Sequence, residues 1–149
     1  MTEVRFYHLQ KQTMDEALPL ILQKAYASKK NIVVRFSDEE EVERINNYLW
    51  SFKQRSFLPH GSKANGNAEH QPIWLTADND NPNNAKILVL TAGQSEENMD
   101  QFDLCCDMLD GRSDEQVSQA RERWKTYKEK GFEVTYWVQD DSGKWEQKS

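Results

Sequence analysis

Short apolar segments alternate along this chain with longer stretches of helical periodicity, and this alternation constrains the fold more than any other feature. The short segments are rich in β-branched and aromatic residues, which favour strands. One of them, Asn31–Phe36 (NIVVRF), is almost continuously apolar, as expected for a strand that is covered on both faces. Strands interleaved with helices predict a three-layer α/β domain with a mostly parallel sheet and an antiparallel edge pair.

Capping signals indicate where the predicted helices begin and end. Thr13 can form a capping box with Glu16, and Ser37 and Ser113 stand at the starts of the second and third helices. Gly131 is placed as a glycine that ends a helix. The predicted helices are 14–28, 38–50 and 114–130, and the predicted strands are 4–9, 31–36, 72–75, 86–91, 102–109 and 133–138.

The chain length of 149 residues predicts one domain, 1–149, in which 139–149 form a polar C-terminal tail. No apolar run is long enough to cross a bilayer, and the N-terminus lacks the pattern of a secretory signal. Cys105 and Cys106 are adjacent and have no second pair, which favours reduced thiols. These features predict a cytoplasmic location.

The glycines argue against a nucleotide site. The chain has six of them, and neither G-x-G-x-x-G nor G-x-x-x-x-G-K-[ST] occurs. The first predicted strand-to-helix connection, Gln10–Met14, contains no glycine, so its backbone could not easily approach a pyrophosphate. Histidine and cysteine spacings do not match a zinc site. No cofactor, metal or catalytic residue is therefore expected.

A basic stretch near the C-terminus is the first candidate binding feature. Arg121 to Lys130 contains five Lys or Arg and two acids, whereas the whole chain has a formal charge of −6. One stripe at helical spacing consists of Val117, Ala120, Trp124 and Tyr127, and the cations beside it are Arg121, Lys125 and Lys128. The stripe predicts packing on the sheet. The cations form either a solvated face or a site for an acidic peptide with an aromatic end, or for phosphates.

An aromatic cluster near residue 50 is the second candidate feature. It contains Trp50, Phe52 and Phe57 and is followed by Pro59 and His60. The predicted helix already has an apolar stripe, so some of these rings lack an obvious place in the core. Either the loop folds back on the domain, or the rings form an exposed patch for a protein partner.

Three stretches carry a family resemblance: FYHL near the N-terminus, LW…SFLPHG after residue 48, and ARERWKTYKEKGF at 120–132. In order and length the chain resembles the chi subunit of bacterial DNA polymerase III holoenzyme. The resemblance implies a Rossmann-like α/β fold without a nucleotide site and a non-catalytic role in the replisome. It also implies two partners. One is the psi subunit of the clamp loader, or an alternative helicase partner. The other is the acidic, Phe-ended C-terminal tail of single-stranded DNA-binding protein.

The resemblance assigns residues to both surfaces. Arg121, Trp124, Lys125 and Lys128 match the site for the acidic tail, with Trp124 standing where a tyrosine is familiar in the family. Trp50, Phe57, Pro59 and His60 match the partner-docking surface. The acids of 38–41 and the polar loop 61–70 depart from the family pattern. Direct binding of single-stranded nucleic acid and an uncharacterised Rossmann-like enzyme remain the alternatives.

Overall fold

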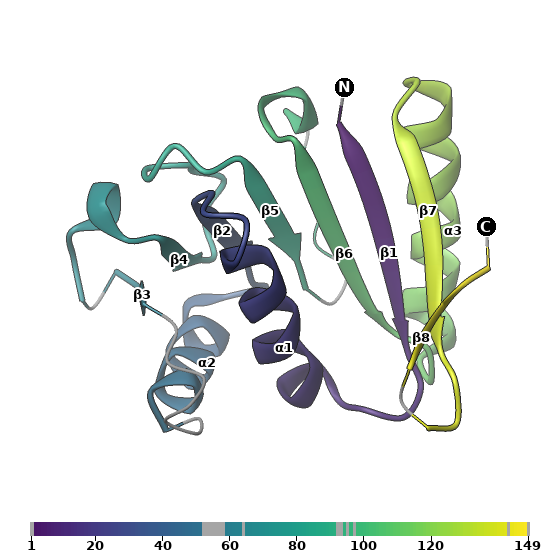
Figure 1. The fold of residues 1–149 in the computed structure, drawn as a ribbon, viewed down its shortest axis with the longest axis horizontal. Helices are drawn as coiled ribbons and strands as arrows, with labels where there is room; N and C mark the ends of the chain where they lie inside the picture. Colours follow the sequence, from purple (N-terminus) through teal and green to yellow (C-terminus); the bar gives the residue numbers. More distant parts are fainter. Residues whose placement is uncertain are drawn as a thin grey trace.

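The computed structural model describes residues 2–51, 59–63, 65–91, 94, 96, 98–142 and 144–148 (Figure 1). In chain order the elements are β1 (Glu3–Leu9), α1 (Met14–Tyr26), β2 (Ile32–Arg35), α2 (Glu39–Ser51), β3 (His60–Gly61), the 3-10 helix η2 (Ala68–His70), β4 (Ile73–Thr76), β5 (Ile87–Leu90), the 3-10 helix η3 (Met99–Gln101), β6 (Leu104–Asp110), α3 (Asp114–Glu129), β7 (Glu133–Gln139) and β8 (Trp145–Gln147). None of the helices in these ranges is long and apolar enough to cross a membrane.

The described strands form one sheet in the order β3-β4-β2-β5-β6-β1-β7-β8. All neighbouring pairs are parallel except β7 and β8, which are antiparallel at the edge. Helices α1 and α2 lie on one face of the sheet and α3 lies on the other (Figure 1). The predicted three-layer α/β fold with a mostly parallel sheet is therefore confirmed.

Strand β1, between β6 and β7, shows how the two cores are separated. Val4 and Phe6 pack with residues of α3, whereas Tyr7 and Leu9 pack with residues of α1 and α2. Side chains of a strand alternate between the two faces of a sheet, so His8 points to the same face as Phe6. The end of β1 thus contributes a histidine to the α3 side.

The predicted starts of α1 and α3 are confirmed, as is the glycine that ends α3. The predicted start of α2 is corrected. The Thr13 capping box is present, Ser113 accepts a hydrogen bond from the Gln116 N–H, and Gly131 has φ +83° just after α3. The prediction that Ser37 caps the second helix was wrong. The Asp38 carboxylate accepts from the Glu41 N–H at 2.8 Å, so α2 begins one residue later. A carboxylate at this place is also favoured by the helix dipole.

Two short strands were not predicted. His60–Gly61 forms β3 beside β4, within a segment expected to be a loop. The segment expected to be a polar tail contains β8, whose Trp145 lies edge-on to Tyr7 with ring centroids 5.0 Å apart. Such short strands have no periodicity of their own, because their pairing with a distant strand defines them.

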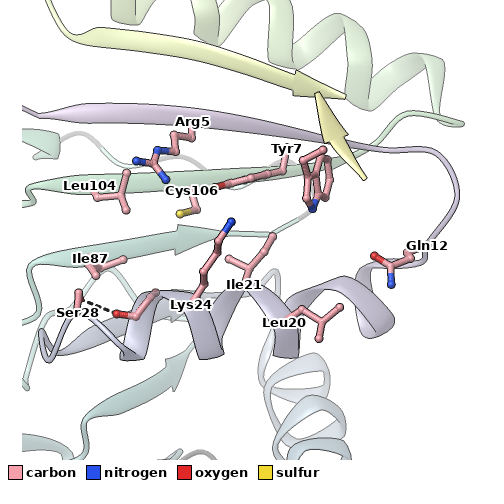
Figure 2. A pocket seen from close by; sticks show the side chains of 12 residues that line it. Arg5, Tyr7, Gln12, Leu20, Ile21, Lys24, Ser28, Ile87, Leu104 and Cys106 are labelled. Atoms are coloured by element: carbon pink, nitrogen blue, oxygen red, sulfur yellow. Dashed lines mark hydrogen bonds between the residues drawn. The ribbon is translucent and has the colours of Figure 1, made fainter. Parts of the chain in front are cut away.

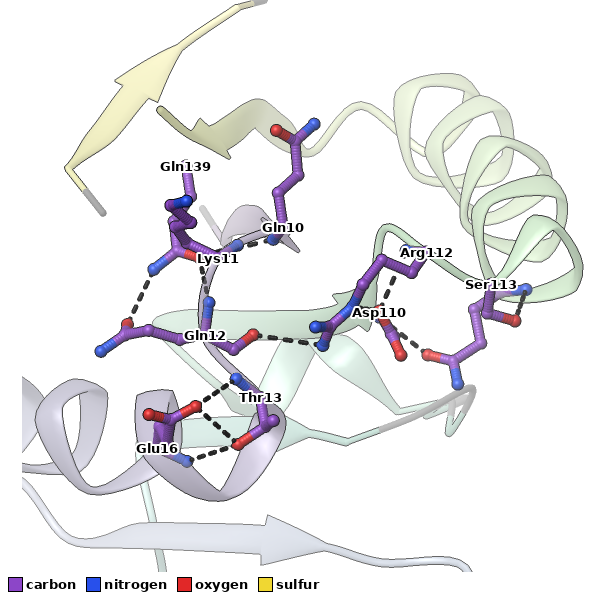
Figure 3. Close-up of polar contacts among 10 residues, drawn as sticks. Gln10, Lys11, Gln12, Thr13, Glu16, Asp110, Arg112, Ser113 and Gln139 are labelled. Carbon is purple, nitrogen blue, oxygen red and sulfur yellow. Dashed lines mark hydrogen bonds and ion pairs between the residues drawn. The ribbon is translucent and has the colours of Figure 1, made fainter. Parts of the chain in front are cut away.

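The connection from β1 to α1 is held by a side chain from β7 (Figure 3). The Gln139 carboxamide oxygen accepts from the backbone N–H groups of Gln10, Lys11 and Gln12 at 3.4, 3.1 and 3.1 Å. In nucleotide-binding α/β domains, backbone N–H groups of this first connection hold a phosphate. Here the chain supplies its own acceptor to the three donors, and Gln139 is 1% exposed.

Replacing Gln139 by leucine should lower the free energy of unfolding by about 1–3 kcal/mol, because three backbone donors lose a buried acceptor while the side-chain volume is kept. Urea denaturation measures the change. The matched control is Gln119→Leu on the exposed surface of α3, for which we expect a change within about 0.5 kcal/mol. Equal effects of the two substitutions would contradict the role given to Gln139.

Candidate protein-docking site

A groove of about 310 Å³ lies between α3 and the ends of β1 and β7. Its lining residues are His8 in β1, Gln10 just after β1, Val117, Arg121 and Trp124 on α3, and Tyr136 and Val138 on β7. The walls are mostly apolar or aromatic, and the cation at the groove is Arg121. Such a surface suits a ligand that has both an apolar group and a negative charge.

The walls of the groove are positioned by the stripe of α3 that packs on the sheet. Ala120 and Tyr127 are 0% and 4% exposed, whereas Trp124 is half-buried. The Trp124 ring lies 5.9 Å from the Phe6 ring and 6.0 Å from the Tyr136 ring, measured between centroids. Trp124 therefore contacts the core and also lines the groove.

The predicted tail-binding cations do not all lie together. Arg121 is exposed and lines the groove. The Lys128 ammonium lies over the Trp124 ring, 5.2 Å from its centroid. Lys125 does not line the groove, and its Nζ lies 3.9 Å from the Glu122 carboxylate on the same helix. Of the four predicted residues, Arg121 and Trp124 thus line the groove, whereas Lys128 contacts the Trp124 ring without lining the groove and Lys125 lies outside it.

The sequence did not identify His8 and Tyr136 as residues of the groove. His8 Nδ1 and the Tyr136 hydroxyl are 2.7 Å apart and share a hydrogen bond. Burial, and then the charge of Arg121, lower the pKa of His8, while Asp110 acts in the opposite direction. The alternation along β1 and β7 was the signal that could have placed both side chains on the α3 face.

Arg123, another cation of α3, pairs with the sheet and does not line the groove. Arg123 donates two hydrogen bonds to the Asp107 carboxylate of β6, at 2.7 and 2.9 Å. The two side chains are 12% and 1% exposed. Burial raises the pKa of Asp107 to about 6, and the hydrogen bonds from Arg123 oppose that shift. Arg123 therefore holds α3 to the sheet, although it lies only two residues from Arg121.

The second predicted surface lies at the end of α2. Trp50 is 51% exposed, and its ring centroid is 4.4 Å from that of His60. His60 itself is 3% exposed, and its Nε2 lies 3.4 Å from the Asn46 carbonyl oxygen. Pro59 is half-buried, and Phe57 lies outside the described residues. Trp50 and His60 thus come together, with the tryptophan on the outside and Pro59 next to His60 in the chain.

Metal-ligating side chains are dispersed in the described part of the chain. Among those residues, no group of three His, Cys, Asp or Glu side chains could hold a metal ion. Cys105 and Cys106 are buried free thiols, and burial raises the pKa of Cys106 to about 12.

The fold and the groove together define a Rossmann-like α/β protein with a basic and aromatic surface groove. A family model described as DNA polymerase III chi subunit, HolC, matches residues 1–135, and the chain belongs to this family. It is similar to the probable DNA polymerase III subunit chi of Rickettsia prowazekii (strain Madrid E), with 33% identity over 90 residues. The matched region is 60% of this chain and 54% of that relative, so the match spans about half of the relative's length.

Proposed function

We propose that this protein is a non-catalytic adaptor that links the clamp loader to single-stranded DNA-binding protein in the cytoplasmic replisome. The groove at α3 binds the acidic, Phe-ended C-terminal tail of that protein. The observation that carries the proposal is the position of the exposed Arg121 at the edge of a groove walled by Val117, Trp124 and Tyr136. In this arrangement a carboxylate of an acidic tail can pair with Arg121. The terminal aromatic ring of the tail can pack against the apolar walls of the groove.

The expected affinity follows from the two kinds of contact. Burying a phenylalanine ring contributes about 1.5–3 kcal/mol, and a charged hydrogen bond to Arg121 contributes about 1.5–3 kcal/mol. Losses of translational and conformational freedom offset part of this gain. A dissociation constant on the order of micromolar is therefore reasonable.

The aromatic patch at the end of α2 is the proposed surface for the second partner, the psi subunit or an alternative helicase partner. Trp50 supports the assignment, because it is a large side chain with 51% of its surface exposed. Its contact with the buried His60 fixes the ring at the surface, and fixed aromatic anchors are typical of protein interfaces. Pro59 and Phe57 complete the proposed surface.

Direct binding of single-stranded nucleic acid by the same helix is the alternative function. It would use Trp124 for base stacking and the nearby lysines for phosphates. The position of Lys128 over the Trp124 ring argues against it, because the cation covers a face on which a base would stack. The formal charge of −6 also disfavours a general affinity for nucleic acid.

A peptide titration tests the proposal. A fluorescent acidic peptide ending in phenylalanine should bind the full chain with an affinity that weakens as salt rises from about 50 to about 300 mM. A peptide of equal charge without the phenylalanine should bind at least about tenfold more weakly. Oligothymidylate should not bind at low salt. Binding of the oligonucleotide without binding of the peptide would overturn the proposal and support the alternative.

A further inference from the structure

A second hollow of the described residues lies on the opposite face of the sheet from the groove. It has a volume of about 460 Å³ and opens between α1 and the strands β1 and β6 (Figure 2). Its floor contains Cys106 and Ile87, which are 2% exposed each. Its size falls in the range of small-molecule sites, about 300–1,000 Å³.

The hollow exists because α1 lies along only part of this face of the sheet. Arg5 and Tyr7 of β1 point to the α1 side, where α1 presents Leu20 and Lys24 across the gap (Figure 2). Trp145 of β8 forms another part of the wall, with its ring edge-on to Tyr7. Residues of β5 and β6 complete the lining, so the wall is built from segments that lie far apart in the chain.

The apolar part of the lining is partly open to solvent. Leu20 is 47% exposed, although it is a large apolar side chain at the rim. Ile21, Leu104 and Trp145 continue the apolar surface inward. An apolar surface of this kind gains stability when a ligand with an apolar body covers it.

Two cations face the same space. Figure 2 shows Lys24 extending from α1 toward the strands and Arg5 pointing from β1 toward Leu104 and Cys106. The charges of Arg5 and Lys24 both lower the pKa of the buried Cys106 thiol. Burial raises that pKa and is the stronger effect. Arg5 contacts Glu3 through its Nε at 2.6 Å. Lys24 makes no ion pair with an acidic side chain in the described part of the chain.

The remaining polar groups also suit an anion. Burial raises the pKa of Tyr7 to about 12, so its hydroxyl keeps its proton and can donate a hydrogen bond. Gln12 contributes a neutral amide at one end. No carboxylate of the described residues lines the hollow. Glu3, which pairs with Arg5, acts on the pKa values of Tyr7 and Cys106 in the opposite direction to Arg5. Lys24 has no such partner in the described part of the chain.

We propose that this hollow is a binding site for a small amphipathic carboxylate, whose head contacts Lys24 and Arg5 and whose apolar body lies against Leu20, Leu104 and Trp145. The two cations complement the carboxylate, and the apolar lining complements the body of the ligand. Inorganic phosphate fits less well, because it has no apolar body to cover Leu20 and Leu104. The site is separate from the groove at α3, so it does not depend on the function proposed for that groove.

An NMR titration of the isotope-labelled full chain tests the proposal, with octanoate as the probe and octanol as its neutral counterpart. Octanoate should cause saturable shifts in the amide signals of α1, β1 and β8. Octanol should bind about tenfold more weakly, because it lacks the charge that Lys24 and Arg5 recognise.

Two variants locate the binding. Lys24→Met keeps the stem of the side chain, removes its charge, and should weaken octanoate binding about tenfold. Arg121→Ala, at the α3 groove, should leave it unchanged. Shifts confined to α3 and β7, equal binding of octanol, or an unchanged affinity in Lys24→Met would each overturn the proposal. Because Lys24 is an exposed helix residue, the variant should fold, and its amide spectrum verifies this.

Discussion

Replacing Arg123 by alanine is expected to lower the free energy of unfolding by about 3–5 kcal/mol at neutral pH, the largest stability effect that we predict. The reason is the buried ion pair between α3 and β6. Arg123 donates two hydrogen bonds to the Asp107 carboxylate, which is 1% exposed. Without the guanidinium, that carboxylate stays buried with its main cationic partner removed. Chemical denaturation followed by circular dichroism measures the loss.

The pH dependence of this loss has a definite sign. Burial raises the pKa of Asp107 from 3.8 to about 6 in the folded protein. Between these two values the folded state binds more protons than the unfolded state, so the contribution of Asp107 to stability falls as pH rises from about 4 to about 6. Removing Arg123 raises the folded pKa further and extends this fall above pH 6. The loss in free energy of unfolding caused by Arg123→Ala should therefore be smaller near pH 5.5 than near pH 8.

Lys125→Ala is the matched control for this experiment, because it removes an exposed cation from the same helix. Its 3.9 Å pair with Glu122 joins two side chains that are 70% and 76% exposed. Exposed pairs of this kind contribute little, so we expect a change within about 0.5 kcal/mol. A deficit for Arg123→Ala that is as small as the control, or that does not depend on pH, would contradict the structural role of the pair.

Replacing Arg121 by alanine is expected to weaken binding of the acidic, Phe-ended peptide about 10- to 100-fold, because a charged hydrogen bond at the groove is lost. Lys125→Ala should weaken binding only about twofold, because Lys125 lies outside the groove and is screened by solvent. The double variant should resemble Arg121→Ala. Fluorescence anisotropy at low salt measures all three affinities.

Lys86→Ala serves as the control for loss of one positive charge, since Lys86 is exposed and lies before β5, away from the groove. Its affinity for the peptide should match that of the wild-type chain. Thermal unfolding of each variant verifies that the fold is kept. An unchanged affinity in the Arg121→Ala, Lys125→Ala double variant would place the tail elsewhere and remove the main support for the proposed site.

Local patterns were sufficient for most of the fold. The continuous apolar run around β2 indicated a strand covered on both faces, and all four of its residues, Ile32–Arg35, are buried. The capping box at Thr13 and the glycine at 131 marked real helix limits, because such signals depend on neighbours within one turn. Local patterns failed for β3 and β8, because pairing with distant strands stabilises them.

The candidate site was predictable only in part. Helical spacing divided α3 into a packed stripe and a charged side, which accounts for the buried Tyr127 and the exposed Arg121. Helical spacing could not predict that His8 and Tyr136 lie at the groove, since these residues come from β1 and β7. Nor could it show that the Gln139 oxygen occupies the first strand-to-helix connection, 127 residues or more from its partners.

The two arginines of α3 mark the division between sequence and structure. The sequence by itself determined that this helix is basic and amphipathic, because both properties depend only on the order of residues. The tertiary structure decided which cation is free to bind. Arg123 faces a buried carboxylate on β6 and must pair with it, whereas Arg121 faces solvent at the groove. The physical reason is that the energy of a charge depends on its surroundings, and the surroundings are assembled only when distant strands meet.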